Sequence, residues 1–425
     1  MTGVRGIVVC MALACFVAVA CDGDGDGAST PTPTAGAPSP VATPTPDDNE
    51  VRALRFLEPA VLPDNLAVIV ETGCWQCDGP ATGYVRIRRL PDGTLEERTL
   101  IDPDAYGGML SGAVFDAQPG LVYVAVCERG CSGEPDARTT LYESRDGGVT
   151  VTPLASFDAW RYLVGYSSAG ALMIAPVPDA ESPVPLFDAR GMAIAGPADG
   201  IHPHPLPNEI LWVSDGRSTL RAGDNTVLST SVGDQIADVS PLDSQGEVLA
   251  VSIYRNGAPP GYRLSIRRRA PNTLMHVRTF DGFIGVGPAL DDCRFFGNTD
   301  LPAGAIPTPD TGGGAFTGFV PVIVDWCDGT AQPIVEPFTR APYLNGRNFI
   351  MAVQRGPFVG VPDDIGDCLN VRADASTGAM VLGCFTAGVL LRDMQESRNV
   401  DGQVWRRVTT PSGAEGWAAA AFLAP

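Results

Sequence analysis

Residues 139–155 read TTLYESRDGGVTVTPLA, the clearest strand–turn–strand pattern in the chain. Two runs rich in β-branched and aromatic residues flank the turn Asp146-Gly147-Gly148. Glycine accepts the positive φ angles of tight turns, and an aspartate carboxylate accepts hydrogen bonds from nearby backbone N–H groups. The segment therefore predicts a β-hairpin.

The preceding unit repeats this order of elements. Residues 83–101 read GYVRIRRLPDGTLEERTLI, two strand-like runs around a Pro-Asp-Gly turn. The two units superpose with a period of roughly 55 residues, and weaker copies follow as far as Gly329. Sheets of this size repeated radially form a β-propeller, and we expect about six or seven blades within residues 51–361. A run of β-sandwiches is the alternative.

Composition supports an all-β fold. The 425 residues include 49 Gly and 38 Pro, and only 18% are charged, which suits short strands joined by turns. The 49 acidic residues outnumber the 29 basic ones, for a formal net charge of -20. A chain with no basic surplus cannot displace the counterions of phosphate backbones, so nucleic acid is excluded as an expected partner.

The N-terminus predicts export. Residues 1–21 place Arg5 before an apolar run that suits a signal peptide and is short for a membrane span. The end of this run, Ala18-Val19-Ala20-Cys21, resembles the lipobox of bacterial lipoproteins, which implies that Cys21 carries a lipid. Ordinary cleavage and a retained anchor are the alternatives, and both also export the chain.

Residues 22–50 predict a disordered spacer, because they lack aromatic residues and almost all large apolar ones. Its first six residues, DGDGDG, are similar to the start of a calcium loop. The twelfth position of such a loop supplies a carboxylate, and here it is Pro33. A solvated acidic linker is therefore the interpretation that we adopt.

Eight cysteines follow Cys21, and an even number in an exported chain indicates disulfides. Pairing between neighbours is the simplest arrangement. It joins Cys74 to Cys77, Cys127 to Cys131, Cys293 to Cys327 and Cys368 to Cys384. A zinc site made by the first four cysteines is the alternative, which an oxidising compartment disfavours.

The hairpin turn matches the Asp-box pattern Ser-x-Asp-x-Gly-x-Thr through Ser144, Asp146, Gly148 and Thr150. This motif resembles the repeat of sialidase propellers, where it lies at outer turns away from the active centre. The resemblance therefore implies architecture. Ser144 and Thr150 also suit a hairpin directly, because they can pair across its strands.

A sialidase-like glycoside hydrolase is the alternative function that this resemblance raises. Such an enzyme needs an arginine cluster, a tyrosine nucleophile with a glutamate partner, and an acid aspartate. Tyr84, Arg86 and Arg88 alternate along one strand-like run, which we interpret as a strand with a solvated face.

Residues 362–425 resemble a bacterial SH3 domain. Leu369-Asn370-Val371-Arg372 matches the opening strand of the family, and Glu415-Gly416-Trp417 matches a later one. The resemblance implies a small β-barrel that binds cell-wall peptides or protein segments without catalysis. Trp405 either lines the binding groove or packs on the barrel, whereas Trp417 is expected in the core.

Other candidate sites are few. Trp75, between two cysteines, is either a ligand contact or a cover for a disulfide. His202 and His204 flank a proline in an expected surface loop, with a metal site as the alternative. We assign no catalytic residue, metal or cofactor. The sequence predicts a lipid-anchored binding or scaffold protein of the cell envelope, whose partners are the membrane and a cell-wall peptide, glycan or protein.

Overall fold

The structure is a computed structural model. It describes residues 51–72, 83–101, 109–115, 121–129, 131, 136–166, 172–176, 186–188, 190–194, 200, 202–206, 209–243, 245–255, 261–282, 285–299, 320–336 and 349–425. Among these residues no helix is long and apolar enough to cross a membrane. The expected signal peptide with Cys21, the linker, and the segment with Cys74, Trp75 and Cys77 lie outside the described residues.

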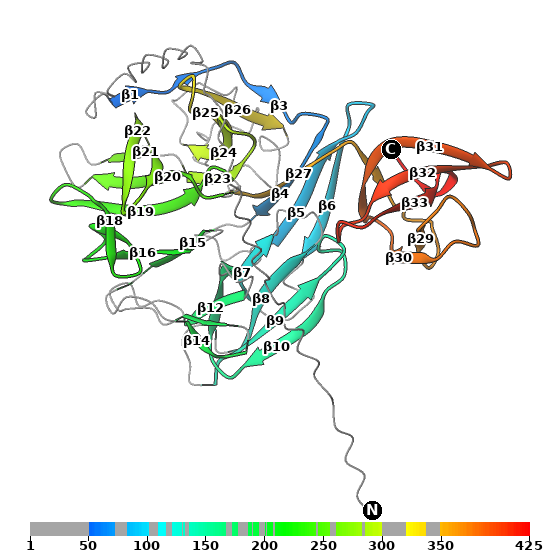
Figure 1. Ribbon diagram of the computed structural model, residues 1–425, viewed down its shortest axis with the longest axis horizontal. Coiled ribbons are helices and arrows are strands. Elements are labelled where there is room, and N and C mark those ends of the chain that lie inside the picture. Colours follow the sequence, from blue (N-terminus) through cyan, green and yellow to red (C-terminus); the bar gives the residue numbers. More distant parts are fainter. Residues whose placement is uncertain are drawn as a thin grey trace, which may run out of the picture. The chain divides into compact units, whose positions relative to one another are not determined.

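Six sheets in the described chain have the strand order of propeller blades, each an antiparallel meander of four strands (Figure 1). Blades one and two comprise β27 (Phe349–Arg355), β4 (Leu66–Thr72), β5 (Gly83–Arg89) and β6 (Leu95–Ile101), then β7 (Met109–Phe115), β8 (Val122–Arg129), β9 (Arg138–Ser144) and β10 (Thr152–Phe157). Blades three and four comprise β11 (Arg161–Tyr166), β12 (Leu172–Pro176), β13 (Leu186–Asp188) and β14 (Ala193–Ile194), then β15 (His202–Pro205), β16 (Ile210–Ser214), β17 (Thr219–Ala222) and β18 (Asn225–Ser229).

Blades five and six gain extra strands from the start of the described chain. They comprise β19 (Asp234–Pro241), β20 (Val248–Arg255), β21 (Gly261–Ala270) and β22 (Thr273–Asp281), then β23 (Gly285–Ala289), β24 (Arg294–Thr299), β25 (Val320–Asp325) and β26 (Thr330–Glu336). Strand β1 (Val51–Ala53) adds to β22 in parallel, and β2 (Arg55–Phe56) and β3 (Ala60–Val61) add to β26 in parallel.

The blades form a closed cycle, because an apolar cluster joins each described blade to the next. Strand β8 contributes side chains to the apolar clusters on both faces of blade two. Its consecutive residues Val124 and Ala125 are each 1% exposed and point to opposite faces. Val124 packs in the cluster shared with blade one, and Ala125 packs in the cluster shared with blade three. Further clusters join blades three to four, four to five, five to six, and six back to one.

A strand from the far end of the propeller completes blade one. β27 pairs antiparallel with β4, and the apolar cluster between blades six and one includes Ile350 from β27 and Phe296 from β24. Blade one is thus built from residues at both ends of the propeller. The pairing of β27 with β4 therefore closes the ring of blades.

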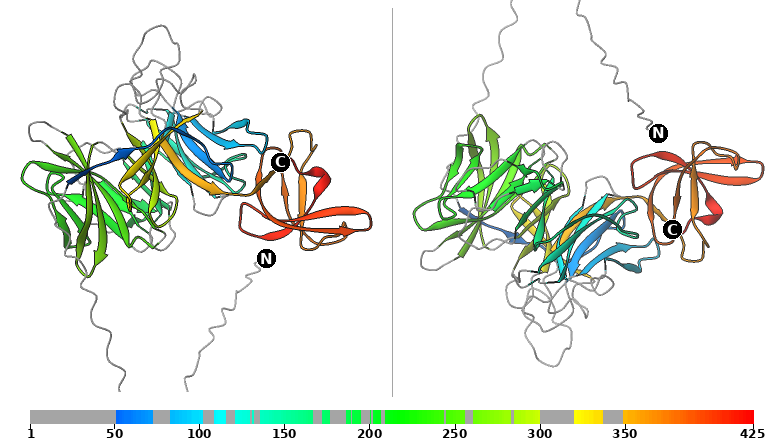
Figure 2. Two further views of the ribbon diagram at one scale, coloured as in Figure 1. Left: turned by 90° about the horizontal axis from the view of Figure 1, so that it is seen from above. Right: turned by 90° about the horizontal axis from the view of Figure 1, so that it is seen from below.

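The remaining strands form one six-stranded sheet that curls into a half-barrel, coloured orange to red in Figure 2. Its order is β28 (Phe358–Gly360), β31 (Leu390–Val400), β32 (Gln403–Thr409), β33 (Glu415–Ala419), β29 (Leu369–Arg372) and β30 (Val381–Phe385), with the 3-10 helix η3 (Ala420–Phe422) after β33. Its interior is a small apolar cluster around Val371, Leu391 and Val408. β28 precedes residue 362 and yet pairs with β31, so the C-terminal sheet begins before that residue.

Candidate functional site

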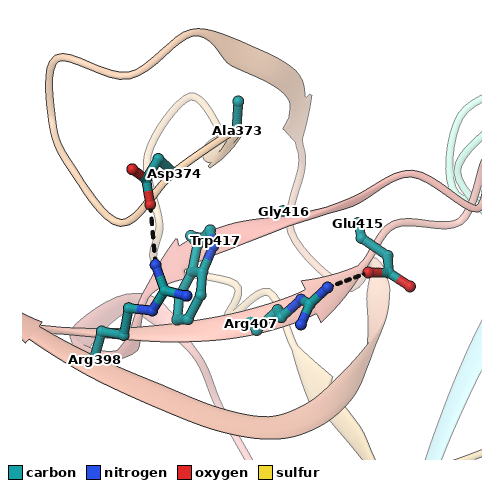
Figure 3. A pocket seen from close by; sticks show the side chains of 7 residues that line it. All are labelled: Ala373, Asp374, Arg398, Arg407, Glu415, Gly416 and Trp417. Carbon is teal, nitrogen blue, oxygen red and sulfur yellow. Dashed lines mark hydrogen bonds and ion pairs between the residues drawn. The ribbon is translucent and has the colours of Figure 1, made fainter.

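The C-terminal sheet carries a cavity of about 280 Å³ on one of its faces (Figure 3). Its lining comes from the loop after β29, from β31, and from β32 and β33. The side chains that define it are charged, apart from one indole at its base: Asp374, Arg398, Arg407, Glu415 and Trp417. A cavity of this composition suits a polar ligand.

The charged groups form a ladder in which acidic and basic side chains alternate. Arg398 donates to Asp374 at 3.3 Å and to Glu396 at 3.3 Å. Arg407 donates to Glu396 at 2.9 Å and to Glu415 at 2.6 Å. The hydrogen bond from Arg407 holds the pKa of Glu396 below its usual value. Each arginine of this ladder thus lies between two carboxylates.

The indole of Trp417 fixes the position of one cation in this ladder. The guanidinium carbon of Arg398 lies 4.3 Å from the centroid of the Trp417 ring, a cation–π contact that Figure 3 shows from the side. Strand register brings Arg407 to the same face, because Arg407 is the direct partner of Trp417 across β32 and β33. Both arginines therefore lie on the face of the sheet that carries Trp417.

Trp405 lies on the same face, two positions before Arg407 on β32. It is 3% exposed and packs with Ala375, Trp417 and Ala419. It also lines a second cavity of about 210 Å³, together with Gln403 and Phe422. Trp405 therefore packs on the sheet and also lines a cavity, while Trp417, expected in the core, is 5% exposed and lines the first cavity.

The Asp-box residues organise the turn between β9 and β10. Asp146 Oδ1 accepts hydrogen bonds from the Ser144 hydroxyl at 2.8 Å and from Thr150 N at 2.9 Å, and Asp146 Oδ2 accepts from the Thr150 hydroxyl at 2.6 Å. Gly148, at φ 89°, donates its N–H to Ser144 Oγ at 2.8 Å. Ser144 and Thr150 therefore meet through Asp146, and the described contacts of these side chains serve the turn.

The interpretation of Arg86 and Arg88 as members of a solvated face is wrong. Arg86 is 2% exposed and Arg88 is 6% exposed. Arg86 donates to the carbonyl oxygen of Gly388 at 2.8 Å, and Arg88 donates to the backbone oxygen of Pro425 at 2.9 Å. Both side chains are covered by the C-terminal sheet, which the sequence placed in a separate module. They bind this sheet and do not converge on the inner strands of the blades.

A tyrosine and a glutamate do lie together in blade one, but the tyrosine is unsuited to nucleophilic attack. Tyr84 on β5 is the direct partner of Glu71 on β4. Tyr84 is 2% exposed, and burial, helped by the charge of Glu71, raises the pKa of its hydroxyl far above the usual value. A nucleophile needs a lowered pKa or an adjacent base that removes its proton. Burial and the negative charge of Glu71 both oppose ionisation of the Tyr84 hydroxyl.

Disulfides join three of the neighbouring cysteine pairs. The pairs are Cys127 with Cys131, Cys293 with Cys327, and Cys368 with Cys384. Cys127 and Cys131 pair with each other, so they are not part of the four-cysteine zinc site considered from the sequence. Disulfides of this kind indicate an extracytoplasmic protein.

The His-Pro-His segment is not the surface loop that the sequence indicated. Its residues form β15, the first strand of blade four, and His204 faces Asp238 of blade five, with 3.6 Å between Nδ1 and Oδ1. Tertiary pairing overrides the loop preference of proline here, because β15 is an edge strand of its sheet. Within the described residues no group of three or more His, Cys, Asp and Glu side chains is arranged to hold a metal.

The charged residues of the ladder were not among the candidates predicted from the sequence, which were aromatic: Asp374, Glu396, Arg398 and Arg407 are the residues concerned. A signal was present, because acidic and basic residues alternate at strand spacing in the segment ESR (residues 396–398) and recur in WRR (residues 405–407). Charged pairs across neighbouring strands are a pattern that can be searched for once a hairpin is expected.

Comparisons with protein-family models and with curated proteins each found no match to this chain. Among solved structures, an uncharacterized protein from Listeria monocytogenes is 8% identical, with a TM-score of 0.37, and the match covers 86% of this chain and 96% of that one. A putative 6-phosphogluconolactonase from Bacteroides fragilis is 12% identical, with a TM-score of 0.38, over 85% of this chain and 95% of that one.

The β-propeller domain of the trilobed protease from Pyrococcus furiosus is 8% identical, with a TM-score of 0.25, over 88% of this chain and 85% of that one. Similarities at this level carry no argument about activity. The assignment of six described blades rests on the strand order and on the clusters that join the sheets.

Proposed function

We propose that this protein binds a peptide bearing both carboxylate and amino groups at the bacterial cell envelope, and that the cavity over Trp417 is the binding site. One observation carries the proposal: four charged side chains of alternating sign line a cavity with a single indole on one face of the C-terminal sheet, and Glu396 joins the two arginines among them. A ligand carboxylate would bind Arg398 and Arg407 in place of their present partners. A ligand ammonium would bind the carboxylates so released, Asp374 and Glu415.

The exchange of partners is energetically accessible because these pairs are exposed to solvent. The side chains of Arg398 and Asp374 are 51% and 70% exposed. Ion pairs at exposed sites contribute only about 0–1 kcal/mol each, so a ligand that replaces both partners loses little when it breaks them. Cell-wall stem peptides carry both charge types, and the resemblance of this sheet to bacterial SH3 domains supports the same class of ligand.

Export and lipid anchoring complete the proposal. The disulfides support an oxidising compartment, and the resemblance of residues 18–21 to a lipobox supports an acyl chain on Cys21. A lipid at Cys21 and the spacer of residues 22–50 would tether the propeller near the membrane within reach of the wall. Metabolic labelling with radioactive palmitate tests the anchor: the wild type should be labelled and Cys21→Ser should not, and equal labelling of both would refute it.

Co-sedimentation of the full chain with purified peptidoglycan tests the site. The variants Arg398→Gln and Arg407→Gln each remove one cation of the ladder, and each is expected to weaken binding about tenfold. Arg392→Gln is the matched control, because Arg392 is an exposed arginine on the same strand as Arg398 and does not line the cavity. Failure of the wild type to sediment would refute the ligand class. Equal loss or equal retention for all three variants would refute the site.

A further inference from the structure

A third cavity, also of about 210 Å³, lies between blades four and five of the propeller. It is separate from the C-terminal sheet and has no part in the proposed peptide site. Strands β18 and β22 approach each other here. The lining comes from the end of β18, the following turn, the start of β19, strands β20, β21 and β22, and Val51 of β1. The cavity therefore lies beside the first described residue of the chain.

The side chains at its wall share one face of the hairpin β21–β22. Register pairs Ser265 with Thr279, and Arg267 with His276. Arg263 lies on the same face of β21, two positions before Ser265, because side chains two apart on a strand point the same way. All five residues line the cavity. Two guanidinium groups, two hydroxyls and an imidazole are thereby gathered on one side.

The charge of this wall is opposite to that of the chain. The guanidinium groups of Arg263 and Arg267 line it against the single carboxylate of Asp234, and Asp281, the ion-pair partner of Arg263, lies outside the lining. The whole chain has 49 acidic residues and 29 basic ones. The net charge of the chain is -20, so its surface as a whole repels anions. The positive charge of this wall makes the cavity a favourable position for an anion.

The polar groups are held in place by bonds within the wall. Arg267 Nε donates to Ser265 Oγ at 2.8 Å, and Ser265 is 1% exposed. His276 Nε2 lies 2.9 Å from Thr279 Oγ1. Arg263 Nε donates to Asp281 at 3.0 Å. Fixed donors lose little conformational entropy when a ligand binds, so a built wall of this kind favours binding.

We propose that this cavity binds a phosphate group. A tetrahedral dianion accepts several hydrogen bonds at once, which matches the planar donors of Arg263 and Arg267 and the hydroxyls of Ser265 and Thr279. The volume is several times the roughly 30 Å³ share of one water molecule, so the site admits a phosphate together with a small organic group. Asp234 lines the cavity too, and the two guanidinium groups outweigh the repulsion between its carboxylate and the bound anion.

Isothermal titration of the full chain with inorganic phosphate, in chloride buffer of constant ionic strength, tests the proposal. We expect saturable binding at one site, weakened about tenfold in Arg267→Gln. Arg268→Gln is the matched control, because Arg268 is the next residue on β21, is exposed and does not line the cavity, and its affinity should equal that of the wild type. Thr279→Val removes one hydroxyl without a change of charge and should weaken binding several-fold, which covers the case that Arg267→Gln does not fold.

Two results would overturn the proposal: no saturable heat with the wild type at millimolar phosphate, or equal affinity in Arg267→Gln, Thr279→Val and Arg268→Gln. Glycerol 3-phosphate, used in a second titration, should bind at least as tightly as inorganic phosphate if the site takes a phosphomonoester. Weaker binding of glycerol 3-phosphate than of inorganic phosphate would refute the claim that the cavity admits an organic group beside the phosphate. The variants of the C-terminal ladder should bind phosphate as the wild type does, so failure of the peptide site and failure of this site are distinguishable.

Discussion

Arg86 of blade one donates a hydrogen bond of 2.8 Å to the carbonyl oxygen of Gly388, 302 residues later in the C-terminal sheet. Arg98 on the next strand donates to the carbonyl oxygen of Ala387 at 3.0 Å and forms an ion pair with Asp363 at 3.1 Å. Val149, from the Asp-box turn, packs against the apolar cluster of that sheet. Blades one and two thus provide the surface on which the C-terminal sheet docks.

Removal of the Arg86 guanidinium should destabilise this contact. Burial lowers the pKa of Arg86 to about 10, an effect that the nearby carboxylate of Glu96 opposes. Arg86→Met keeps an apolar stem but leaves the Gly388 carbonyl without this buried donor, while Glu96 keeps its ion pair with Arg88. A buried acceptor left without its hydrogen bond costs about 1–3 kcal/mol, so we expect the free energy of unfolding to fall by about 2 kcal/mol.

Urea denaturation followed by tryptophan fluorescence measures the effect of Arg86→Met. Arg190→Met is the control, because Arg190 is exposed in blade three, and this change should stay within about 0.5 kcal/mol of the wild type. Should Arg86→Met and Arg190→Met unfold alike, the hydrogen bond to Gly388 contributes no net stability.

The disulfides should differ in what they contribute, in order of the loops they close. Cys293–Cys327 spans 34 residues and Cys127–Cys131 spans 4, so loop entropy predicts about 4 kcal/mol for the first and about 2 kcal/mol for the second. Thermal unfolding of the two double alanine variants should therefore show the larger loss of melting temperature for Cys293→Ala with Cys327→Ala. The reverse order would mean that native packing, and not chain entropy, decides their contribution.

The strands of individual blades could be predicted from the sequence because their signals are local. The run LVYVAV contains most of β8, and the turn that ends β9 follows directly from its aspartate and glycines. The closure of the ring could not be predicted. β27 pairs with β4, and β1 pairs with β22. In each pairing the two strands are far apart in the sequence, and no local sequence pattern in either strand indicates its partner.

In the candidate site, too, features with a local sequence signal could be predicted, and features that depend on long-range contacts could not. Short motifs in residues 362–425 predicted a small C-terminal β domain, and they contain both of its tryptophans. The charge ladder depends on an irregularity between β31 and β32, where the register shifts between Asp393 and Ser397 and Gln395 has a φ of 58°. This bulge lies at Glu396, which contacts both arginines. The buried state of Arg86 escaped prediction for a similar reason, since the surface that covers it is 302 residues away.

His204 should make the stability of the propeller depend on pH. Its Nδ1 lies 3.6 Å from Asp238 Oδ1, across the boundary between blades four and five. Burial lowers the pKa of His204 below the usual 6.5, more than the negative charge of Asp238 raises it, and the positive charge of Arg217 lowers it further. Below pH 6.5 the unfolded chain therefore binds more protons at this site than the folded chain does.

The sign of the effect follows from that difference in bound protons. Stability rises with pH wherever the unfolded state binds more protons, so His204 contributes a loss of stability as the pH falls below about 6.5. The free energy of unfolding, measured in urea between about pH 5 and 7, should decline toward acid more steeply in the wild type than in His204→Gln. An identical slope in both would show that His204 titrates alike in the folded and unfolded chains. Asp238→Asn removes the charge that favours the protonated imidazole, so its decline should be steeper than that of the wild type, and a shallower one would contradict the assigned role of Asp238.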